Sequence, residues 1–196
     1  MTKKCFERFP LIVGWEVTLG CNLRCRHCGS RAGACRAHEL SAGEALAICD
    51  QFPDLLVQEV DFTGGEPLTC PYWSRVAARL AKLEIRTKLI TNGLLLSRDV
   101  ARQLRDVGIQ GVGISVDGLE DTHDDLRCHR GLFRHIAQAA GWIVSEGIPL
   151  TALTTVTAKN IDQLRSLFPV VEAMGARYWQ LQPVFAYGDR KSTRLN

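Results

Sequence analysis

The sequence predicts an α/β fold in which parallel strands and helices alternate as a partial (βα)6 barrel of the TIM type. Apolar, β-branched runs recur along the chain, separated by helical patterns of roughly 10–15 residues, which is typical of βαβ units and a parallel sheet. Every distinctive polar motif directly follows one of these runs. An open α/β sheet would have the same alternation of strands and helices. A barrel of six strands, instead of the usual eight, would be open at one side.

The expected strands lie at residues 11–18, 57–63, 85–91, 111–116, 149–156 and 177–183. The expected helices lie between them: one from Ser41 toward Pro53, then 72–83, 97–108, 132–146 and 160–175. Ser41 and Glu44 form a capping-box pattern, and we expect Asn160 to cap the last helix. No sixth helix is recognisable after residue 183.

Composition excludes several classes of protein. The 196 residues suffice for one domain, and a net charge of +3 without a basic block argues against a nucleic-acid partner or a membrane surface. No apolar run reaches the length of a membrane span, and the first residues lack the apolar segment of a signal peptide. Eight cysteines without a secretion signal favour a reducing compartment, the cytoplasm, and metal chemistry over disulfides.

Three of those cysteines lie close together in a short loop after the first strand. Cys21, Cys25 and Cys28 have the spacing C-x3-C-x2-C. Three thiolates on a cluster of four irons leave one iron without a protein ligand, where chemistry can occur. The alternative is a structural zinc site, with Cys35 or His38 as its fourth ligand.

Polar motifs follow the remaining strands at their carboxyl ends. They are Gly64-Gly65-Glu66-Pro67, Asn92-Gly93, Ser115 with Asp117-Gly118, Thr154-Thr155, and Gln180 with Gln182-Pro183. Each motif alone could be an ordinary turn, and Asn-Gly pairs often form hairpins, but a helical pattern follows this one. Because the carboxyl ends of parallel strands share one edge, these motifs together predict a single site.

With the cysteine loop, in which His27 precedes the last cysteine, these motifs resemble the radical S-adenosylmethionine (radical SAM) superfamily. The resemblance covers residues 16–183. It implies a [4Fe–4S] cluster on Cys21, Cys25 and Cys28, where S-adenosylmethionine (SAM) binds the open iron. It also implies a set of SAM-binding residues: Gly64, Gly65, Glu66 and Pro67 for the methionyl amine, Asn92, Ser115 and Asp117 for the ribose or carboxylate, and Arg127 for the carboxylate.

The same resemblance implies an enzyme that cleaves SAM reductively to a 5′-deoxyadenosyl radical, which takes hydrogen from a substrate. The residues around the cysteine loop are most similar to the peptide-modifying branch, found in SPASM-containing enzymes. A peptide substrate is therefore expected, and small-molecule cofactor biosynthesis is the alternative. A low-potential electron donor such as a flavodoxin or ferredoxin is implied as a partner.

We expect an N-terminal extension at 1–10, a radical SAM core domain at 11–188 and a short tail at 189–196. The tail resembles read-through or truncated coding sequence, so an inert fragment is a further alternative. The residues expected to line the substrate side are Trp179, Gln180, Gln182 and Tyr187. Trp179 is equally compatible with a core position.

Overall fold

The structure of the protein is a computed structural model that describes residues 11–183. The expected extension at 1–10, the tail at 189–196 and Tyr187 lie outside the described residues. Among the described residues, no helix has the length and apolar character needed to cross a membrane.

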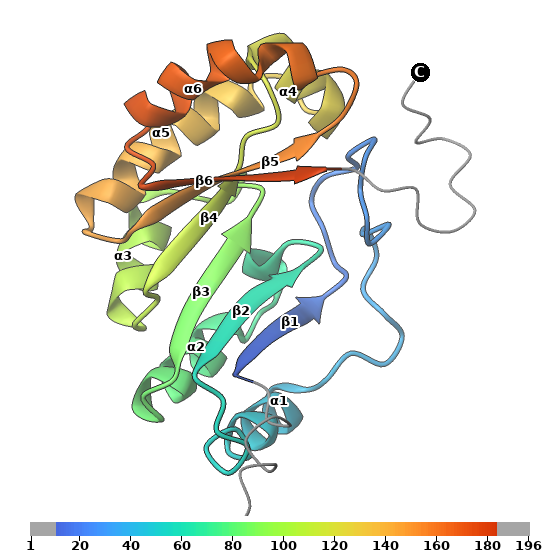
Figure 1. The fold of residues 1–196 in the computed structure, drawn as a ribbon. Helices are drawn as coiled ribbons and strands as arrows, with labels where there is room; N and C mark the ends of the chain where they lie inside the picture. The colour runs from blue at the N-terminus through green and yellow to red at the C-terminus, as the bar shows by residue number, and fades with distance from the viewer. Residues whose placement is uncertain (1–10, 184–196) are drawn as a thin grey trace, which may run out of the picture.

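Six parallel strands form one twisted sheet in the order of the chain (Figure 1). They are β1 (Ile12–Thr18), β2 (Glu59–Gly64), β3 (Arg86–Thr91), β4 (Gly111–Ser115), β5 (Leu150–Val156) and β6 (Tyr178–Pro183). Within residues 11–183, β1 and β6 each pair with one neighbour only, so the sheet does not close. The expectation of a partial, TIM-like barrel is confirmed.

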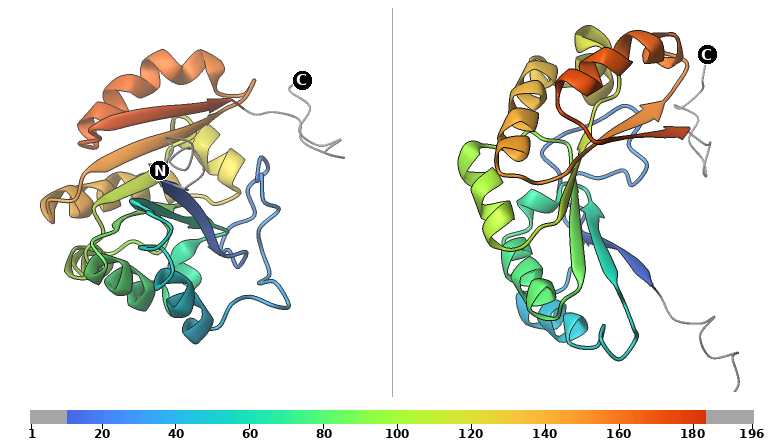
Figure 2. Two further views of the ribbon diagram at one scale, coloured as in Figure 1. Left: turned by 60° about the horizontal axis from the view of Figure 1, so that its bottom comes forward. Right: turned by 60° about the vertical axis from the view of Figure 1, so that its left-hand side comes forward.

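The helices cover the outer face of this sheet and leave the inner face open (Figure 2). They are α1 (Ala42–Cys49), α2 (Trp73–Lys82), α3 (Arg98–Asp106), α4 (Glu120–Arg127), α5 (Leu132–Ser145) and α6 (Leu164–Ala173). Two 3₁₀ turns, Pro67–Thr69 and Ile161–Gln163, complete the helical elements.

Alternation along the strands separates an apolar outer face from a polar inner face. Val60 and Phe62 of β2 are fully buried toward the helices, as are Leu80 of α2 and Leu104 of α3. Burying a side chain of this size stabilises the fold by about 1.5–3 kcal/mol, so this layer holds the sheet and helices together. Asp61, between the two buried β2 residues, faces the inside of the half-barrel and lines a cavity there.

The helix boundaries follow the expected end signals. The Ser41 hydroxyl accepts the Glu44 N–H, and the Glu44 carboxylate accepts the Ser41 N–H, so the capping box at the start of α1 is confirmed. Gly108 and Gly147 follow α3 and α5 with φ of +86° and +75°. Such left-handed backbone at a helix end favours glycine.

Two helix predictions were wrong. Helix α4 was not expected, because Glu120–Arg127 has almost no apolar residues apart from Leu126. Asn160 does not cap a helix: its side-chain NH₂ donates to the carbonyls of Asp117 and Thr155, at 2.7 and 2.8 Å. Helix α6 therefore begins later, at Leu164, after the 3₁₀ turn.

Candidate active site

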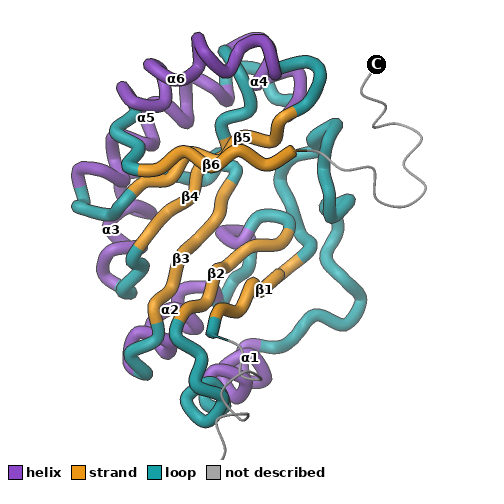
Figure 3. The backbone as a smooth tube through the Cα atoms, viewed as in Figure 1, coloured by secondary structure: helices purple, strands orange, loops and turns teal. Residues whose placement is uncertain are grey.

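A long loop between β1 and α1 carries the three cysteines and folds back on itself (Figure 3). Gly33 closes it by accepting the Cys21 N–H at 3.0 Å and donating to the Leu19 carbonyl at 2.9 Å. The pairing of Gly20 with Gly33 completes this closure. The cysteine loop, residues 19–33, is therefore closed by contacts between its two ends, next to the end of β1.

Glu39 anchors this loop and was not singled out from the sequence. Its carboxylate accepts hydrogen bonds from the Thr18 hydroxyl at 2.8 Å, the Leu19 N–H at 2.7 Å and the Arg36 N–H at 3.0 Å. It therefore ties the end of β1 to the segment that leaves the loop. The only sequence signal for Glu39 is that it is the first acidic residue after Glu16, beyond a segment that contains four arginines.

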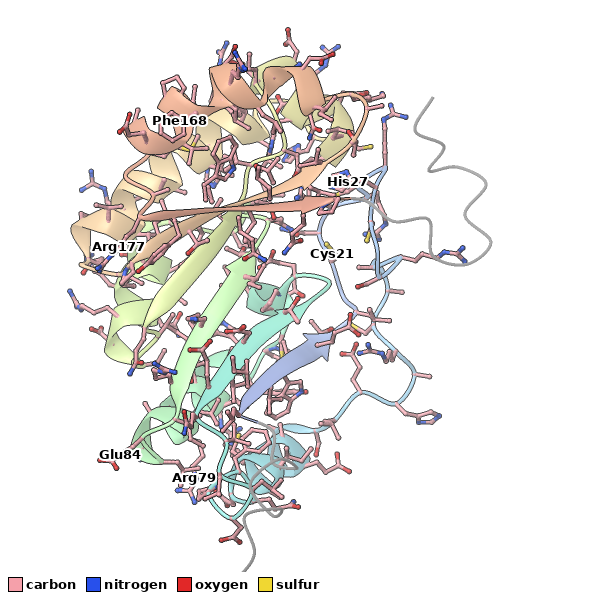
Figure 4. The ribbon with its side chains drawn as sticks, viewed as in Figure 1. Cys21, His27, Arg79, Glu84, Phe168 and Arg177 are labelled. Carbon is pink, nitrogen blue, oxygen red and sulfur yellow. The ribbon has the colours of Figure 1, made fainter. Side chains whose placement is uncertain are left out.

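A cavity of about 320 Å³ lies between this loop and the carboxyl ends of the strands. Figure 4 labels Cys21 and His27 on the loop side of this region. Eight of the residues expected at the site line the cavity: Cys21, Cys25, Cys28, Gly64, Gly65, Asn92, Ser115 and Arg127. Thr155 and Gln182, from β5 and β6, line it as well. The motifs that the sequence places at the carboxyl edge of the sheet therefore contribute residues to one cavity.

All three cysteine sulfurs accept hydrogen bonds from N–H donors. Backbone amides reach Cys21 and Cys28: the Leu23 N–H lies 3.4 Å from one sulfur and the Ala32 N–H 3.3 Å from the other. The Arg127 guanidinium lies 3.8 Å from the Cys25 sulfur. Donors of this kind stabilise thiolates and tune the potential of iron–sulfur clusters.

The protein alone does not favour the anionic form of Cys21 and Cys25. Burial raises the pKa of the Cys21 and Cys25 thiols above their ordinary value, and the neighbouring donors offset only part of this. A bound metal centre deprotonates such thiols. Three thiols with N–H donors around one cavity therefore fit the iron–sulfur cluster that the resemblance implies.

The zinc alternative has no support in this arrangement. Among residues 11–183, no three His, Cys, Asp or Glu side chains lie close enough together to hold a single metal ion. Neither Cys35 nor His38 lines the cavity. The Cys35 sulfur lies instead 3.7 Å from the Thr18 hydroxyl.

Gly64 and Gly65 are required by the backbone of the cysteine loop. A Cβ on Gly64 would lie 2.3 Å from the Thr18 carbonyl oxygen, and one on Gly65 would lie 2.3 Å from that of Gly20. The Gly65 N–H donates to the Thr18 carbonyl at 2.8 Å. Their freedom from side chains thus lets β2 pack against the start of the loop, whereas the sequence had suggested only close approach to a ligand.

Glu66 and Pro67 are placed differently from what the sequence suggested. Both are buried and neither lines the cavity. The Glu66 carboxylate accepts the Thr91 hydroxyl and the Asn92 N–H, each at 2.8 Å, so its oxygens are directed into the protein. In this arrangement Glu66 shapes the end of β3, and its contact with the methionyl amine stays a prediction.

Asp117 does not line the cavity itself, although two residues that it contacts, His27 and Arg127, do. It is fully buried, and Oδ2 lies 2.6 Å from the Arg127 guanidinium and 3.1 Å from His27 Nε2. Oδ1 accepts the Thr155 N–H at 2.8 Å. The Arg127 guanidinium holds the pKa of Asp117 far below its ordinary value, against the effect of burial, so the carboxylate stays ionised.

His27 contributes one unpaired polar atom to the site. Its side chain is 7% exposed, and Nε2 contacts Asp117. Its Nδ1 is buried without a hydrogen-bond partner, although the residue lines the cavity. A buried nitrogen of this kind is a candidate contact for a bound ligand.

The residues expected on the substrate side separate into two groups. Trp179 is partly buried and packs against the core: its indole N–H donates to the Thr154 hydroxyl at 2.9 Å, and its ring centroid lies 6.1 Å from that of Phe168. Gln182 lines the cysteine cavity. Gln180 lines a second cavity of about 440 Å³ deeper in the half-barrel, which shares Ile90 with the first.

Comparisons with known proteins identify the family of this chain. The chain matches the radical SAM superfamily model over residues 15–168. It is 32% identical to an AdoMet-dependent heme synthase of Methanosarcina barkeri, over 85% of this chain and 48% of that protein. It is 31% identical to the mycofactocin maturase of Mycolicibacterium smegmatis, over 91% of this chain and 47% of that one.

A solved structure shows the same fold. SuiB of Streptococcus suis bound to S-adenosylmethionine superposes with a TM-score of 0.84 at 18% identity, over 95% of this chain and 43% of that one. The chain thus spans about half the length of the curated relatives that it matches. The match of the family model to most of the chain shows that the protein belongs to the radical SAM superfamily of enzymes.

Proposed function

We propose that this chain is the catalytic core of a radical SAM enzyme in which Cys21, Cys25 and Cys28 hold a [4Fe–4S] cluster. The observation that carries the proposal is the shared cavity, where three hydrogen-bonded sulfurs face the carboxyl ends of the strands. With three protein thiolates, one iron of such a cluster is open to SAM. When bound and reduced, the cluster supplies the electron that cleaves SAM to methionine and a 5′-deoxyadenosyl radical, which takes a hydrogen atom from the substrate.

The chain's own residues would bind and orient SAM. Asn92 and Ser115, at the ends of β3 and β4, line the cavity with polar side chains, and the Asn92 amide also donates to Asn22 Oδ1 of the cysteine loop at 2.8 Å. Arg127 also lines the cavity, so its guanidinium can pair with a carboxylate while it remains bound to Asp117.

A peptide is the substrate that we propose. The inner face of the sheet is open at one side, and the second cavity adjoins the first through Ile90, which leaves room for an extended ligand. The similarity to mycofactocin maturase also favours a peptide. The lining of the second cavity is polar: it holds Arg86, Lys88 and Arg177 together with Glu59 and Asp61. Glu59 pairs with Lys88 at 2.6 Å and with Arg86 at 3.4 Å, so this cavity would suit a polar part of the substrate.

Small-molecule cofactor biosynthesis is the second candidate. The similarity to a heme synthase at 32% identity favours it. A gene for a short precursor peptide next to this one would support the peptide, and a neighbourhood of cofactor-biosynthesis genes would support the alternative. For either substrate we propose a low-potential flavodoxin or ferredoxin as electron donor. The cytoplasm is the proposed location, because its reducing conditions preserve free thiols.

The decisive test needs no substrate. The chain is reconstituted anaerobically with iron and sulfide, reduced with dithionite and examined by EPR before and after SAM is added. We expect a [4Fe–4S]⁺ signal that changes on addition of SAM. A signal that is indifferent to SAM, or a protein that binds only zinc, would contradict the proposal.

A further inference from the structure

Four side chains form a buried chain of contacts that links the cysteine loop to the end of β4. Asp117 lies at its centre, and its Oδ2 contacts both His27 Nε2 at 3.1 Å and the Arg127 guanidinium at 2.6 Å. Arg127 Nη1 lies 3.8 Å from the Cys25 sulfur. The side chains of Asp117, His27 and Arg127 are 0%, 7% and 11% exposed.

The surrounding backbone fixes Asp117 in place. Its N–H donates to His123 Nδ1 at 3.0 Å, its carbonyl accepts from the Asn160 side chain at 2.7 Å, and its Oδ1 accepts the Thr155 N–H at 2.8 Å. His123 of helix α4 and Asn160 in the loop after β5 thus hold the backbone of this residue, and Thr155 of strand β5 holds its carboxylate. Such a preorganised support determines where the groups bound to it lie.

We propose that Asp117 is a positioning residue that holds the Arg127 guanidinium against the Cys25 sulfur and ties the cysteine loop down through His27, so that the Asp117–Arg127 pair sets the reduction potential of the bound cluster. This inference rests on the proposed function. It differs from the expectation for Asp117, which had been a direct contact to SAM. Both Asp117 oxygens are already bound within the protein.

Electrostatics gives the two members of the pair opposite effects. Reduction adds negative charge to the cluster, so a nearby cation stabilises the reduced state and a nearby anion destabilises it. Few water molecules screen these charges, because the pair is almost fully buried. Removing the carboxylate should therefore raise the potential, and removing the guanidinium should lower it.

The test is a redox titration of the reconstituted 196-residue chain without SAM, followed by EPR. Asp117→Asn removes the charge of the side chain but keeps its shape and one oxygen that can still accept from the Arg127 guanidinium. Because the guanidinium then stays beside the Cys25 sulfur, we expect the midpoint potential of this variant to shift upward. Arg127→Gln should shift the potential downward. The double variant D117N/R127Q leaves neither charge unpaired, and its potential should lie between those of the two single variants.

Asp121→Asn is the matched control, because Asp121 is an exposed carboxylate on the same helix as Arg127. It should leave the potential unchanged. If D117N does not fold, R127Q and the double variant still test the direction in which each charge shifts the midpoint potential. Single variants that shift the potential in the same direction, or not at all, would overturn the inference. A wild-type chain that assembles no cluster would contradict the proposed function instead.

Discussion

The Glu66 carboxylate accepts the backbone N–H of Asn92 at 2.8 Å, and so it joins the end of β2 to the end of β3. The same carboxylate accepts the Thr91 hydroxyl at 2.8 Å and the Leu68 N–H at 3.2 Å. Burial raises the pKa of Glu66, although these donors offset part of that effect. Glu66 is therefore a structural acceptor whose loss leaves several buried donors unpaired.

Glu66→Ala should lower the free energy of unfolding by about 3 kcal/mol, because buried donors left without an acceptor each cost about 1–3 kcal/mol. Glu66→Gln keeps one acceptor oxygen and should cost less, about 1–2 kcal/mol. Urea unfolding followed by circular dichroism measures both changes. The control is Glu172→Ala on the exposed side of α6, which should change stability by less than about 0.5 kcal/mol. Equal effects at the two positions would contradict this role.

The sequence predicted the strands well because each contains several apolar or β-branched residues and lies between polar turn residues or glycines. Strand β4, for example, was expected at 111–116 and spans Gly111–Ser115. Helix α4 escaped detection because its stability comes from tertiary contacts. His123 is fully buried, and the Asp124 carboxylate accepts the Phe133 N–H at 2.9 Å, a contact with the next helix.

The sequence also predicted which residues lie at the site, but it did not predict the direction of their side chains. A pattern places Asp117 and Glu66 at the carboxyl edge of the sheet, yet it does not say whether a carboxylate faces the cavity or the protein. That depends on donors that are distant in the chain, such as the Thr155 N–H for Asp117. Asn160 was misjudged for the same reason, because its amide binds strand ends instead of a helix terminus.

Gly65 and Gly14 form a matched pair for testing how tightly β2 packs against the cysteine loop. Gly65→Ala would place a methyl group 2.3 Å from the Gly20 carbonyl oxygen, whereas a Cβ on Gly14 meets nothing within 4 Å. We expect G65A to destabilise the fold by about 3 kcal/mol, as overpacking against backbone does. G14A should change stability by less than about 1 kcal/mol. Thermal unfolding of both variants compares them, and a tolerated G65A would show that the loop moves freely.

The cysteines differ in what their loss should do. Cys21→Ser, Cys25→Ser and Cys28→Ser should each abolish the visible absorbance and most of the bound iron after anaerobic reconstitution, because three thiolates are the full protein ligand set in the proposed site. Cys35→Ser and Cys128→Ser remove exposed thiols that do not line the cavity and should retain the cluster. Iron and sulfide analysis measures both groups. Loss of iron in C35S would indicate that Cys35 is a fourth protein ligand, which would contradict a site with one open iron.

His123 should make the fold sensitive to mild acid. Burial, with a further contribution from Arg127, lowers the pKa of His123 to about 4, and its neutral Nδ1 accepts the Asp117 N–H. Below pH 6.5 the unfolded chain binds a proton that the folded chain does not, so stability falls as the pH drops from 6.5 toward 4 and levels off below that. The loss is about 1.4 kcal/mol per pH unit and about 3 kcal/mol in total.

Urea unfolding of the wild type and of His123→Gln between pH 7.5 and 4.5 measures this effect. Glutamine keeps an acceptor for the Asp117 N–H but does not titrate, so the variant should show a flatter dependence of stability on pH. His38→Gln removes an exposed histidine and should leave the wild-type slope unchanged. The contribution of Asp117 does not interfere, because its pKa is also depressed and its stabilisation is lost only below the ordinary carboxyl range. A wild-type slope that persists in H123Q would assign the acid sensitivity to another group.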